Sequence, residues 1–145
     1  MWLCGVRIDS PMGFVAHSDG DVAIHALCDA LLGALALGDI GHHFPDSSDE
    51  FKDIDSKILL ARVMDMVRGK GYSVGNVDIT IALQAPKIGR YVPAMRETLA
   101  GLLGVGLDCV SVKATTTEGL GFEGEGLGIS AQSIAVIKRR NQCRK

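Results

Sequence analysis

The segment of residues 17–46 constrains the fold of this chain most. It contains a long apolar stretch typical of a helix, together with all four histidines of the sequence. Ser18 and Asp21 form an S-x-x-D capping box, the signal of a helix N-terminus, and Gly38 occupies the position expected of a C-cap. We therefore expect a helix over 18–37 whose N-terminus can hold an anion.

His25 stands on this helix with Asp21 and Asp29 four residues away on either side, so the three side chains share one face. Carboxylates beside an imidazole can orient it as a metal ligand, and a metal next to an anion indicates phosphate chemistry. The alternative is a histidine satisfied within the core. One histidine is too few for Zn²⁺, which takes about three protein ligands, so the others have to come from elsewhere in the fold.

Strand and helix patterns alternate along the rest of the chain, and no linker or repeat divides it. Strands are expected over 3–8, 77–83, 110–115 and 129–137, and loops over 39–53 and 118–128. A second helix starts at Asp55 or Ser56 and ends at Gly69 and Gly71, and a third has Pro93 in its first turn and stops at Gly104. We expect a single α/β (α+β) domain over 1–145, with a mixed β-sheet covered by helices on one face.

The composition excludes several classes of protein. A formal net charge of −2 leaves no basic surface for nucleic acid, and the cationic run at 138–140 is interpreted as a solvated tail. Four cysteines are scattered without a C-x-x-C pair, which favours reduced thiols over a disulfide framework. The sequence has no signal peptide and no apolar run of about 18 residues, so we expect a soluble, cytoplasmic protein that does not bind membranes.

Three segments have the residue types of a phosphate or nucleotide site. Residues 113–118 end a strand with three threonines, whose hydroxyls suit phosphates while Glu118 suits Mg²⁺; alternatively, the threonines only favour β-structure. The loop 84–87 leaves another strand end, either as a tight or cis-Pro turn or as a loop that reads a base, with Lys87 on a phosphate. His17 and Ser18 either cap the helix or hold a phosphate oxygen.

Together these segments resemble one family, the 2-C-methyl-D-erythritol 2,4-cyclodiphosphate synthases of the non-mevalonate isoprenoid pathway. The matching motifs appear in the family's order and span nearly the whole chain. They are A-H-S-D-G-D-V-A-I-H-A-L-C-D-A-L-L-G over 16–33, G-D-I-G-H-H-F-P-D over 38–46, G-N-V-D over 75–78, Q-A-P-K over 84–87 and K-A-T-T-T-E over 113–118, with L-G-F after it. Such a combination is highly specific.

The resemblance implies a homotrimer with active sites between neighbouring subunits, and a lyase reaction assisted by divalent metals, Zn²⁺ together with Mg²⁺ or Mn²⁺. The 2-phosphate of the cytidylated substrate attacks the cytidine-linked β-phosphate of the same molecule and expels CMP. The resemblance places His25 on Zn²⁺ and Glu118 on Mg²⁺, and it implies catalytic roles for His17 and Thr116. The residues that it implies in substrate binding are Ser18, Asp39, Ile40, Gly41, Phe44, Pro45, Asp46, Ser47, Ser48, Leu83, Gln84, Ala85, Pro86, Lys87, Ile88, Gly89, Thr115, Thr117 and Phe122.

Two departures from the family pattern affect these expectations. The family's opening strand carries an Asp-x-His pair with two further metal ligands, and this sequence has no such segment. A late start codon or a truncation is favoured over a defective homologue, because the downstream motifs are intact. We expect impaired Zn²⁺ binding, since His25 alone cannot build a tetrahedral site. In the glycine-rich loop, Glu125 occupies the family's basic position with Glu123 nearby, which should weaken diphosphate binding.

Two other functions remain open from the sequence. One is a non-catalytic trimeric homologue that binds a cytidine nucleotide or an isoprenoid diphosphate. The other is a metal-dependent phosphohydrolase. Release of CMP from the cytidylated substrate distinguishes the lyase from a binding protein, whereas a phosphohydrolase would release inorganic phosphate.

Overall fold

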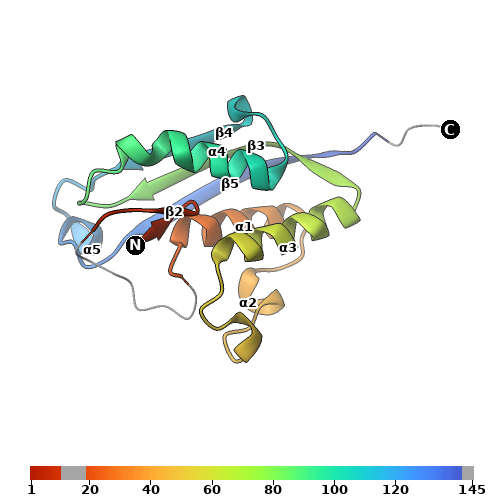
Figure 1. The fold of residues 1–145 in the computed structure, drawn as a ribbon, viewed down its shortest axis with the longest axis horizontal. Coiled ribbons are helices and arrows are strands. Elements are labelled where there is room, and N and C mark those ends of the chain that lie inside the picture. The colour runs from red at the N-terminus through yellow and green to blue at the C-terminus, as the bar shows by residue number, and fades with distance from the viewer. Residues whose placement is uncertain (11–18, 142–145) are drawn as a thin grey trace.

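The computed structural model describes residues 1–10 and 19–141, so the expectations for His17 and Ser18 lie outside the described residues. Its strands and helices are, in chain order, β1 (Trp2–Leu3), β2 (Val6–Arg7), α1 (Val22–Ala34), α2 (Ile40–His43), α3 (Ser56–Gly69), β3 (Tyr72–Ala82), α4 (Val92–Leu103), β4 (Val110–Thr115), α5 (Gly121–Gly124) and β5 (Ser130–Arg139). Short 3-10 turns lie at Asp49–Phe51, Gly89–Tyr91 and Leu107–Cys109. Figure 1 shows α1, α3 and α4 packed beside the strands.

The main sheet has three strands in the order β4-β3-β5. β3 pairs in parallel with β4, from Val77↔Val110 to Ala82↔Thr115, and antiparallel with β5. The expected mixed sheet is therefore confirmed. The parallel pair ends at one edge of the sheet, so the chain segments that follow Ala82 and Thr115 leave the sheet side by side.

The core lies between the sheet and its helices. Alternation along β3 turns Val77, Ile79 and Ile81 inward, and all three are fully buried. α1 packs along β5 and β3, α4 packs along β4, and α3 lies against α1 (Figure 1). α1 contributes Leu27 and Leu31, which are also fully buried and are spaced one helical turn apart.

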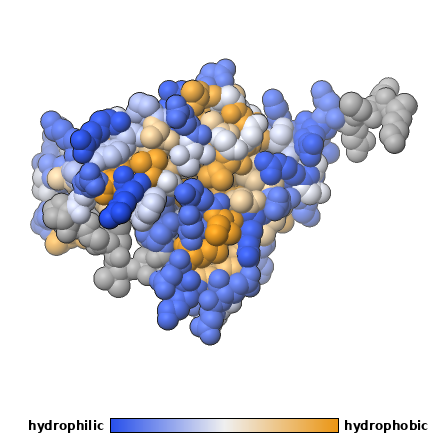
Figure 2. Space-filling view, in the orientation of Figure 1, coloured by the Kyte–Doolittle hydropathy of each residue, from blue (hydrophilic) through white to orange (hydrophobic). Residues whose placement is uncertain are grey.

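The opposite face of the sheet stays open within the described chain. On β5 this face exposes Ile134 and Val136, which are 70% and 52% exposed. On the two other strands it carries polar groups, and Lys113 Nζ lies 2.7 Å from a carboxylate oxygen of Asp78. Figure 2, drawn in the orientation of Figure 1, shows apolar surface in patches between larger hydrophilic areas.

The N-terminus of the first helix differs from the expectation. α1 begins at Val22 and its N-cap is Asp21, not Ser18; Asp21 Oδ1 accepts the backbone N–H of Ile24 at 3.0 Å. The reason is a tertiary contact that the capping-box pattern does not contain. The same carboxylate also accepts the N–H groups of Cys4 at 3.0 Å and Gly5 at 2.7 Å, so it joins the β1–β2 turn to the helix.

Three further expectations are corrected by the structure. The helix ends at Ala34 and not next to Gly38, because Ala36 already has a left-handed φ of 55°. The strand expected over 3–8 is the β1–β2 hairpin, which turns at Cys4 and Gly5 with φ of 50° and 74°. The loops expected over 39–53 and 118–128 contain α2 and α5.

β3 begins at Tyr72 and not at residue 77, and β5 continues to Arg139, because these two strand ends pair with each other; the cationic run expected as a tail therefore lies partly in the sheet. The helices α3 and α4 follow the local signals closely. α3 is capped by the Asp55 side chain, which accepts the N–H of Lys57 at 2.9 Å, and it ends at Gly69. α4 has Pro93 in its first turn and ends at Gly104, which has a left-handed φ of 69°. β4 has the expected bounds. No described helix is long and apolar enough to cross a membrane.

The cysteines of the described chain are free thiols. Cys4 and Cys28 are buried and Cys109 is partly exposed. Burial raises the pKa of the Cys4 and Cys28 thiols far above its ordinary value, and a nearby carboxylate adds to the effect in both cases. Cys4 and Cys28 therefore behave as small apolar core residues, whereas Cys109 lies at the end of the 3-10 turn Leu107–Cys109 and outside the core.

Candidate functional site

The first cluster of functional side chains lies where the N-terminal ends of α1 and α3 meet. His25 Nε2 lies 2.9 Å from the Ser56 hydroxyl, and that hydroxyl donates a very short hydrogen bond to Asp19. Asp19 also accepts the backbone N–H of Ser56 at 2.9 Å and that of Asp21 at 3.1 Å. Asp19 thus links the first turn of α3 to the cap of α1, and Ser56 connects this link to the imidazole.

The two acids that flank His25 in the sequence are used differently from the expectation. Asp21 is fully buried; burial raises its pKa, and the N–H groups of Gly5, Ile24 and Cys4 oppose that rise. Asp29 Oδ1 accepts the N–H of Ile40 at 2.9 Å and so holds the start of α2. Both carboxylates thus bind backbone groups.

Sequence reasoning missed the partners that the imidazole has in the structure. Ser56 lies 31 residues from His25 and 37 residues from Asp19, and no helical or strand period joins such positions. The H-S-D-G-D motif contains Asp19, but its spacing pointed to Asp21 as the first acid on the helix. The signal that could have found Ser56 is its place after Asp55 at the start of a helix, where small hydroxyl residues cluster.

A small cavity of about 180 Å³ adjoins this cluster and is lined by Trp2, Asp19, Asp53 and Asp55. Three acidic residues therefore line one hollow, and one of them, Asp19, connects it through Ser56 to His25. Within residues 1–10 and 19–141, however, no three His, Cys, Asp or Glu side chains are arranged to hold a metal ion. The described residues do not form the complete zinc site that the family pattern implies.

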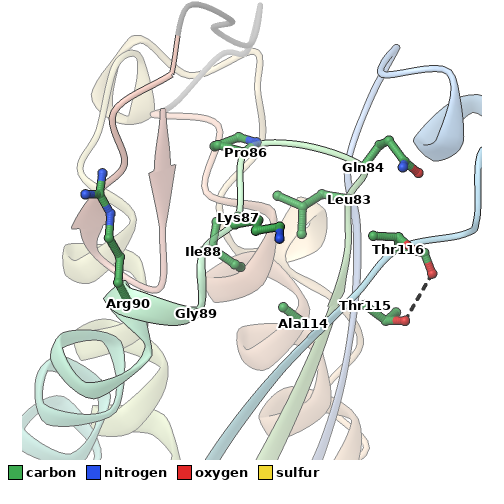
Figure 3. Close-up of a pocket in the computed structure, with 10 residues that line it drawn as sticks. All are labelled: Leu83, Gln84, Pro86, Lys87, Ile88, Gly89, Arg90, Ala114, Thr115 and Thr116. Carbon is green, nitrogen blue, oxygen red and sulfur yellow. Dashed lines mark hydrogen bonds between the residues drawn. The ribbon is translucent and has the colours of Figure 1, made fainter.

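The second cluster is a pocket of about 650 Å³ at the sheet edge where β3 and β4 end (Figure 3). Seven of its ten lining residues are among those expected in substrate binding, and an eighth, Thr116, was expected in catalysis; the seven are Leu83, Gln84, Pro86, Lys87, Ile88, Gly89 and Thr115. The other two, Arg90 and Ala114, were not expected. In Figure 3 the Lys87 side chain points into the pocket, toward the side on which the threonines lie, whereas Arg90 points away.

Several hydrogen bonds hold the walls of this pocket together. Leu83 N–H donates to Thr115 O at 2.9 Å, which continues the parallel pairing of β3 and β4 past the strand end. Gly119 N–H donates to Gln84 Oε1 at 3.2 Å and joins the two loops that follow these strands. The Ala85–Pro86 peptide bond is cis, so the interpretation of this loop as a cis-Pro turn is correct for its backbone.

The pocket combines apolar walls with a few polar groups at one side. Leu83 and Ile88 are buried apolar side chains, while Lys87 and the Thr116 hydroxyl supply a cation and a hydrogen-bond donor. Such a site suits a flat, partly apolar group joined to an anion. The arrangement therefore fits a nucleotide better than a wholly polar ligand.

The glycine-rich segment after β4 forms a compact turn beside the pocket. Glu118 is exposed with a left-handed φ of 54°, and its N–H donates to Thr116 Oγ1 at 3.3 Å. A Cβ on Gly124 would lie 2.2 Å from the carbonyl carbon of Gly119, so α5 packs directly on this turn. Phe122 on α5 is 51% exposed.

The two acids of this segment have different surroundings. Glu123 accepts a hydrogen bond from the Ser130 hydroxyl at 2.8 Å, which fastens α5 to the start of β5. Glu125 is exposed at the C-cap of α5. Glu123 thus has a structural partner within the chain.

Thr117, another expected residue, donates its hydroxyl to the carbonyl oxygen of Leu120. The segment around α2 contains the substrate-binding candidates between Asp39 and Ser48. Asp39 caps α2 by accepting the N–H of His42 at 2.9 Å. Phe44 is buried and packs edge-on against Phe51, with ring centroids 5.3 Å apart, so its ring belongs to the core. The substrate-binding candidates that are partly or fully exposed in this segment are Asp39, Ile40, Gly41, Pro45, Asp46, Ser47 and Ser48.

The sequence model of the YgbB family matches residues 1–138. The chain belongs to the YgbB family. It is 60% identical over 138 residues to a 2-C-methyl-D-erythritol 2,4-cyclodiphosphate synthase of Methylococcus capsulatus, an alignment that covers 95% of this chain and 87% of the relative. The family resemblance drawn from the motifs is therefore confirmed.

Solved YgbB-type structures share the fold. The bifunctional IspDF from Campylobacter jejuni superposes with a TM-score of 0.92 at 43% identity; the match covers 96% of this chain but 38% of that longer chain. A 2C-methyl-D-erythritol-2,4-cyclodiphosphate synthase in a form with CDP bound superposes with a TM-score of 0.88 at 35% identity, covering 95% of this chain and 89% of the other.

Proposed function

We propose that this YgbB-family chain is a 2-C-methyl-D-erythritol 2,4-cyclodiphosphate synthase, a phosphorus-oxygen lyase of isoprenoid biosynthesis. It converts 4-diphosphocytidyl-2-C-methyl-D-erythritol 2-phosphate to the 2,4-cyclodiphosphate and CMP. The observation that carries the proposal is the pocket at the ends of β3 and β4, in a chain 60% identical to a protein of that name. The CDP-bound form of a structural relative supports a nucleotide as the ligand of this fold.

The pocket is proposed to hold the cytidine diphosphate portion of the substrate. The base lies against Leu83 and Ile88, and the phosphates meet Lys87 and the Thr116 hydroxyl. An oxygen of the 2-phosphate then forms a bond to the β-phosphorus, and the bond from that phosphorus to the bridging oxygen of CMP breaks. CMP leaves with the bridging oxygen, so no water is consumed and no inorganic phosphate appears.

This chemistry needs no side-chain nucleophile. Both reacting groups belong to one molecule, so the chain contributes mainly by bringing them together and by neutralising charge. Thr116 and His17 are proposed to stabilise the transition state, and Ser18 to fix a phosphate oxygen. The exposed residues around α2 are proposed to contact the methylerythritol portion.

We propose that His25 and Glu118 contribute to binding of divalent metals. Neutral imidazole suits Zn²⁺ and a carboxylate suits Mg²⁺ or Mn²⁺, so His25 and Glu118 are the proposed ligands. The described residues do not supply a set of three ligands around His25. No step of the reaction is therefore derived from the metal.

We further propose that the chain acts as a single-domain homotrimer in the cytoplasm, with active sites between neighbouring subunits. The support is the uncovered face of the sheet, where Ile134 and Val136 of β5 are exposed beside charged groups. Apolar side chains in such a position are commonly buried by a partner. Ile134→Lys is expected to lower the molar mass measured by light scattering from trimer to monomer, and to abolish CMP release.

Ile58→Lys is the matched control, because Ile58 is 48% exposed on α3, away from this face. It is expected to leave the trimer intact. A wild-type protein whose molar mass by light scattering is that of a monomer at micromolar concentration would contradict the trimer. The lyase activity would then be judged separately, by the assay of CMP release.

The reaction itself is tested by incubating the full chain with the cytidylated substrate and Mg²⁺ or Mn²⁺ and separating the products. The expected products are CMP and the cyclodiphosphate in equal amounts. Thr116→Val, which keeps the shape of the side chain but not its hydroxyl, is expected to lower kcat. Release of inorganic phosphate would indicate a phosphohydrolase, and tight CDP binding without CMP release would indicate a binding protein.

A further inference from the structure

We infer that Asp19 and Ser56 are positioning residues that hold His25 in the Nε2–H tautomer, so that Nδ1 carries the lone pair of the imidazole. The tautomer does not depend on the proposed function. Only the role of that lone pair in the reaction rests on it. The tautomer itself follows from three hydrogen bonds among described side chains and backbone groups.

The argument begins with the direction of each hydrogen bond. Both oxygens of Asp19 receive N–H donors, one from Ser56 and one from Asp21, so this carboxylate acts as an acceptor. The Ser56 hydroxyl has a single proton, and the short bond to Asp19 uses it. The hydroxyl oxygen can then only accept from His25, which requires a proton on Nε2.

The network is rigid because it joins two helix ends. Ser56 is fully buried at the first position of α3, and its N–H and hydroxyl both bind the same carboxylate. Asp19 in turn holds the N–H of Asp21, the N-cap of α1. A rotation of the imidazole would therefore break its hydrogen bond to the hydroxyl of the fully buried Ser56.

The consequence concerns which atom of His25 can do chemistry. A neutral imidazole binds a cation or accepts a proton through its unprotonated nitrogen, and a partner on the other nitrogen sets which one that is. Here the partner holds Nε2, so Nδ1 is assigned as the ligand or acceptor atom. Asp19 reaches His25 through Ser56, and this makes Ser56 the link on which the orientation depends.

Nitrogen NMR of the metal-free, ¹⁵N-labelled full chain tests the tautomer directly. The spectrum is recorded at about pH 8.5, two units above the ordinary histidine pKa, so that neutral rings dominate. His25→Gln identifies the His25 signals by their loss. His43 is an internal reference, because its Nε2 lies 2.8 Å from the carbonyl oxygen of Leu37 and must donate to it. We expect His25 to show the same pattern, with Nε2 protonated and Nδ1 unprotonated.

Variants separate the network from a general effect of folding. Ser56→Ala removes the acceptor, and the His25 nitrogens are expected to move toward the averaged positions of a free imidazole. Ser56→Thr keeps the hydroxyl and is expected to restore the single tautomer. Asp19→Ala removes the acceptor of the hydroxyl proton, which frees that proton for Nε2 and is expected to increase the Nδ1–H form. Ser73→Ala, a serine of β3 outside the network, is the control.

Two results would overturn the inference. One is a wild-type His25 with its proton on Nδ1 or with averaged nitrogens, and the other is a Ser56→Ala protein that folds and keeps a pure Nε2–H form. Neither result depends on catalysis. A chain that releases no CMP but shows the expected tautomer would contradict the proposed function and would leave the inference about His25 intact.

Discussion

The Oε1 atom of Gln84 accepts the backbone N–H of Gly119 at 3.2 Å, and this bond joins the loop after β3 to the turn after β4. Gly119 has a left-handed φ of 78°, so the turn is held in a conformation that few other residues would adopt. Both loops contribute to one rim of the pocket. The shape of the pocket therefore depends on a contact between two residues 35 positions apart in the sequence.

Gln84→Ala is expected to loosen the turn and weaken CDP binding by about fivefold, because one hydrogen bond of about 1 kcal/mol is lost. Amide exchange at Gly119, measured by NMR, should become faster. Gln84→Glu keeps an acceptor oxygen and should preserve slow exchange, although its charge opposes the diphosphate. Unchanged exchange at Gly119 in the alanine variant would show that this bond does not order the turn.

Lys87→Met is expected to weaken CDP binding by about ten- to a hundredfold, since a charge-assisted contact with phosphate is worth about 1.5–3 kcal/mol. Lys87 points into the pocket and methionine retains most of its apolar stem (Figure 3). Calorimetry with CDP and with cytidine separates charge from shape, because cytidine binding should change little. Lys52→Met, at an exposed position outside the pocket, is the control. Equal losses for CDP and cytidine would argue against a phosphate contact.

Asp21→Ala is expected to lower the free energy of unfolding by about 3 kcal/mol, because three backbone N–H groups lose their acceptor and the α1 cap is lost. Asp29→Ala removes one exposed hydrogen bond to Ile40 and should cost about 1 kcal/mol or less. Urea unfolding followed by circular dichroism compares the two. Equal losses would mean that the buried carboxylate has no special part in joining the hairpin to the helix.

Stability at acidic pH should depend on Asp78. The hydrogen bond from Lys113 holds the pKa of this carboxyl below its ordinary value, with smaller help from Ser111 and from the Lys113 charge, while burial acts in the opposite direction. Since the unfolded chain then takes up the proton first, the stabilisation is present above about pH 4 and is lost as the pH falls through the lowered native pKa.

The melting temperature of Asp78→Asn should accordingly vary less than that of the wild type below about pH 4. Asp65→Asn is the control, because Asp65 is 81% exposed and lies 3.8 Å from Arg68. It should follow the wild-type curve. A wild-type curve that is equally flat in this range would contradict the lowered pKa.

Much of the secondary structure could be predicted because its signals are local. Asp55 before α3, Pro93 in α4 and Gly104 after it act on backbone groups within one turn of themselves, and the structure has them in these roles. The pocket residues after β3 were predictable from the Q-A-P-K motif for a related reason. A contiguous loop that leaves a strand end delivers all of its residues to one place.

What the sequence determined by itself is therefore the family, the order of strands and helices, and the segments that could meet a nucleotide. The tertiary structure alone decided that Asp21 caps α1 while holding the β1–β2 turn, and that Ser56 meets both Asp19 and His25. The physical reason is that a buried carboxylate or hydroxyl binds whichever donors packing brings to it. Apart from Ile24, which Asp21 caps, those partners lie 16 to 37 residues away, beyond the repeat of a helix or a strand.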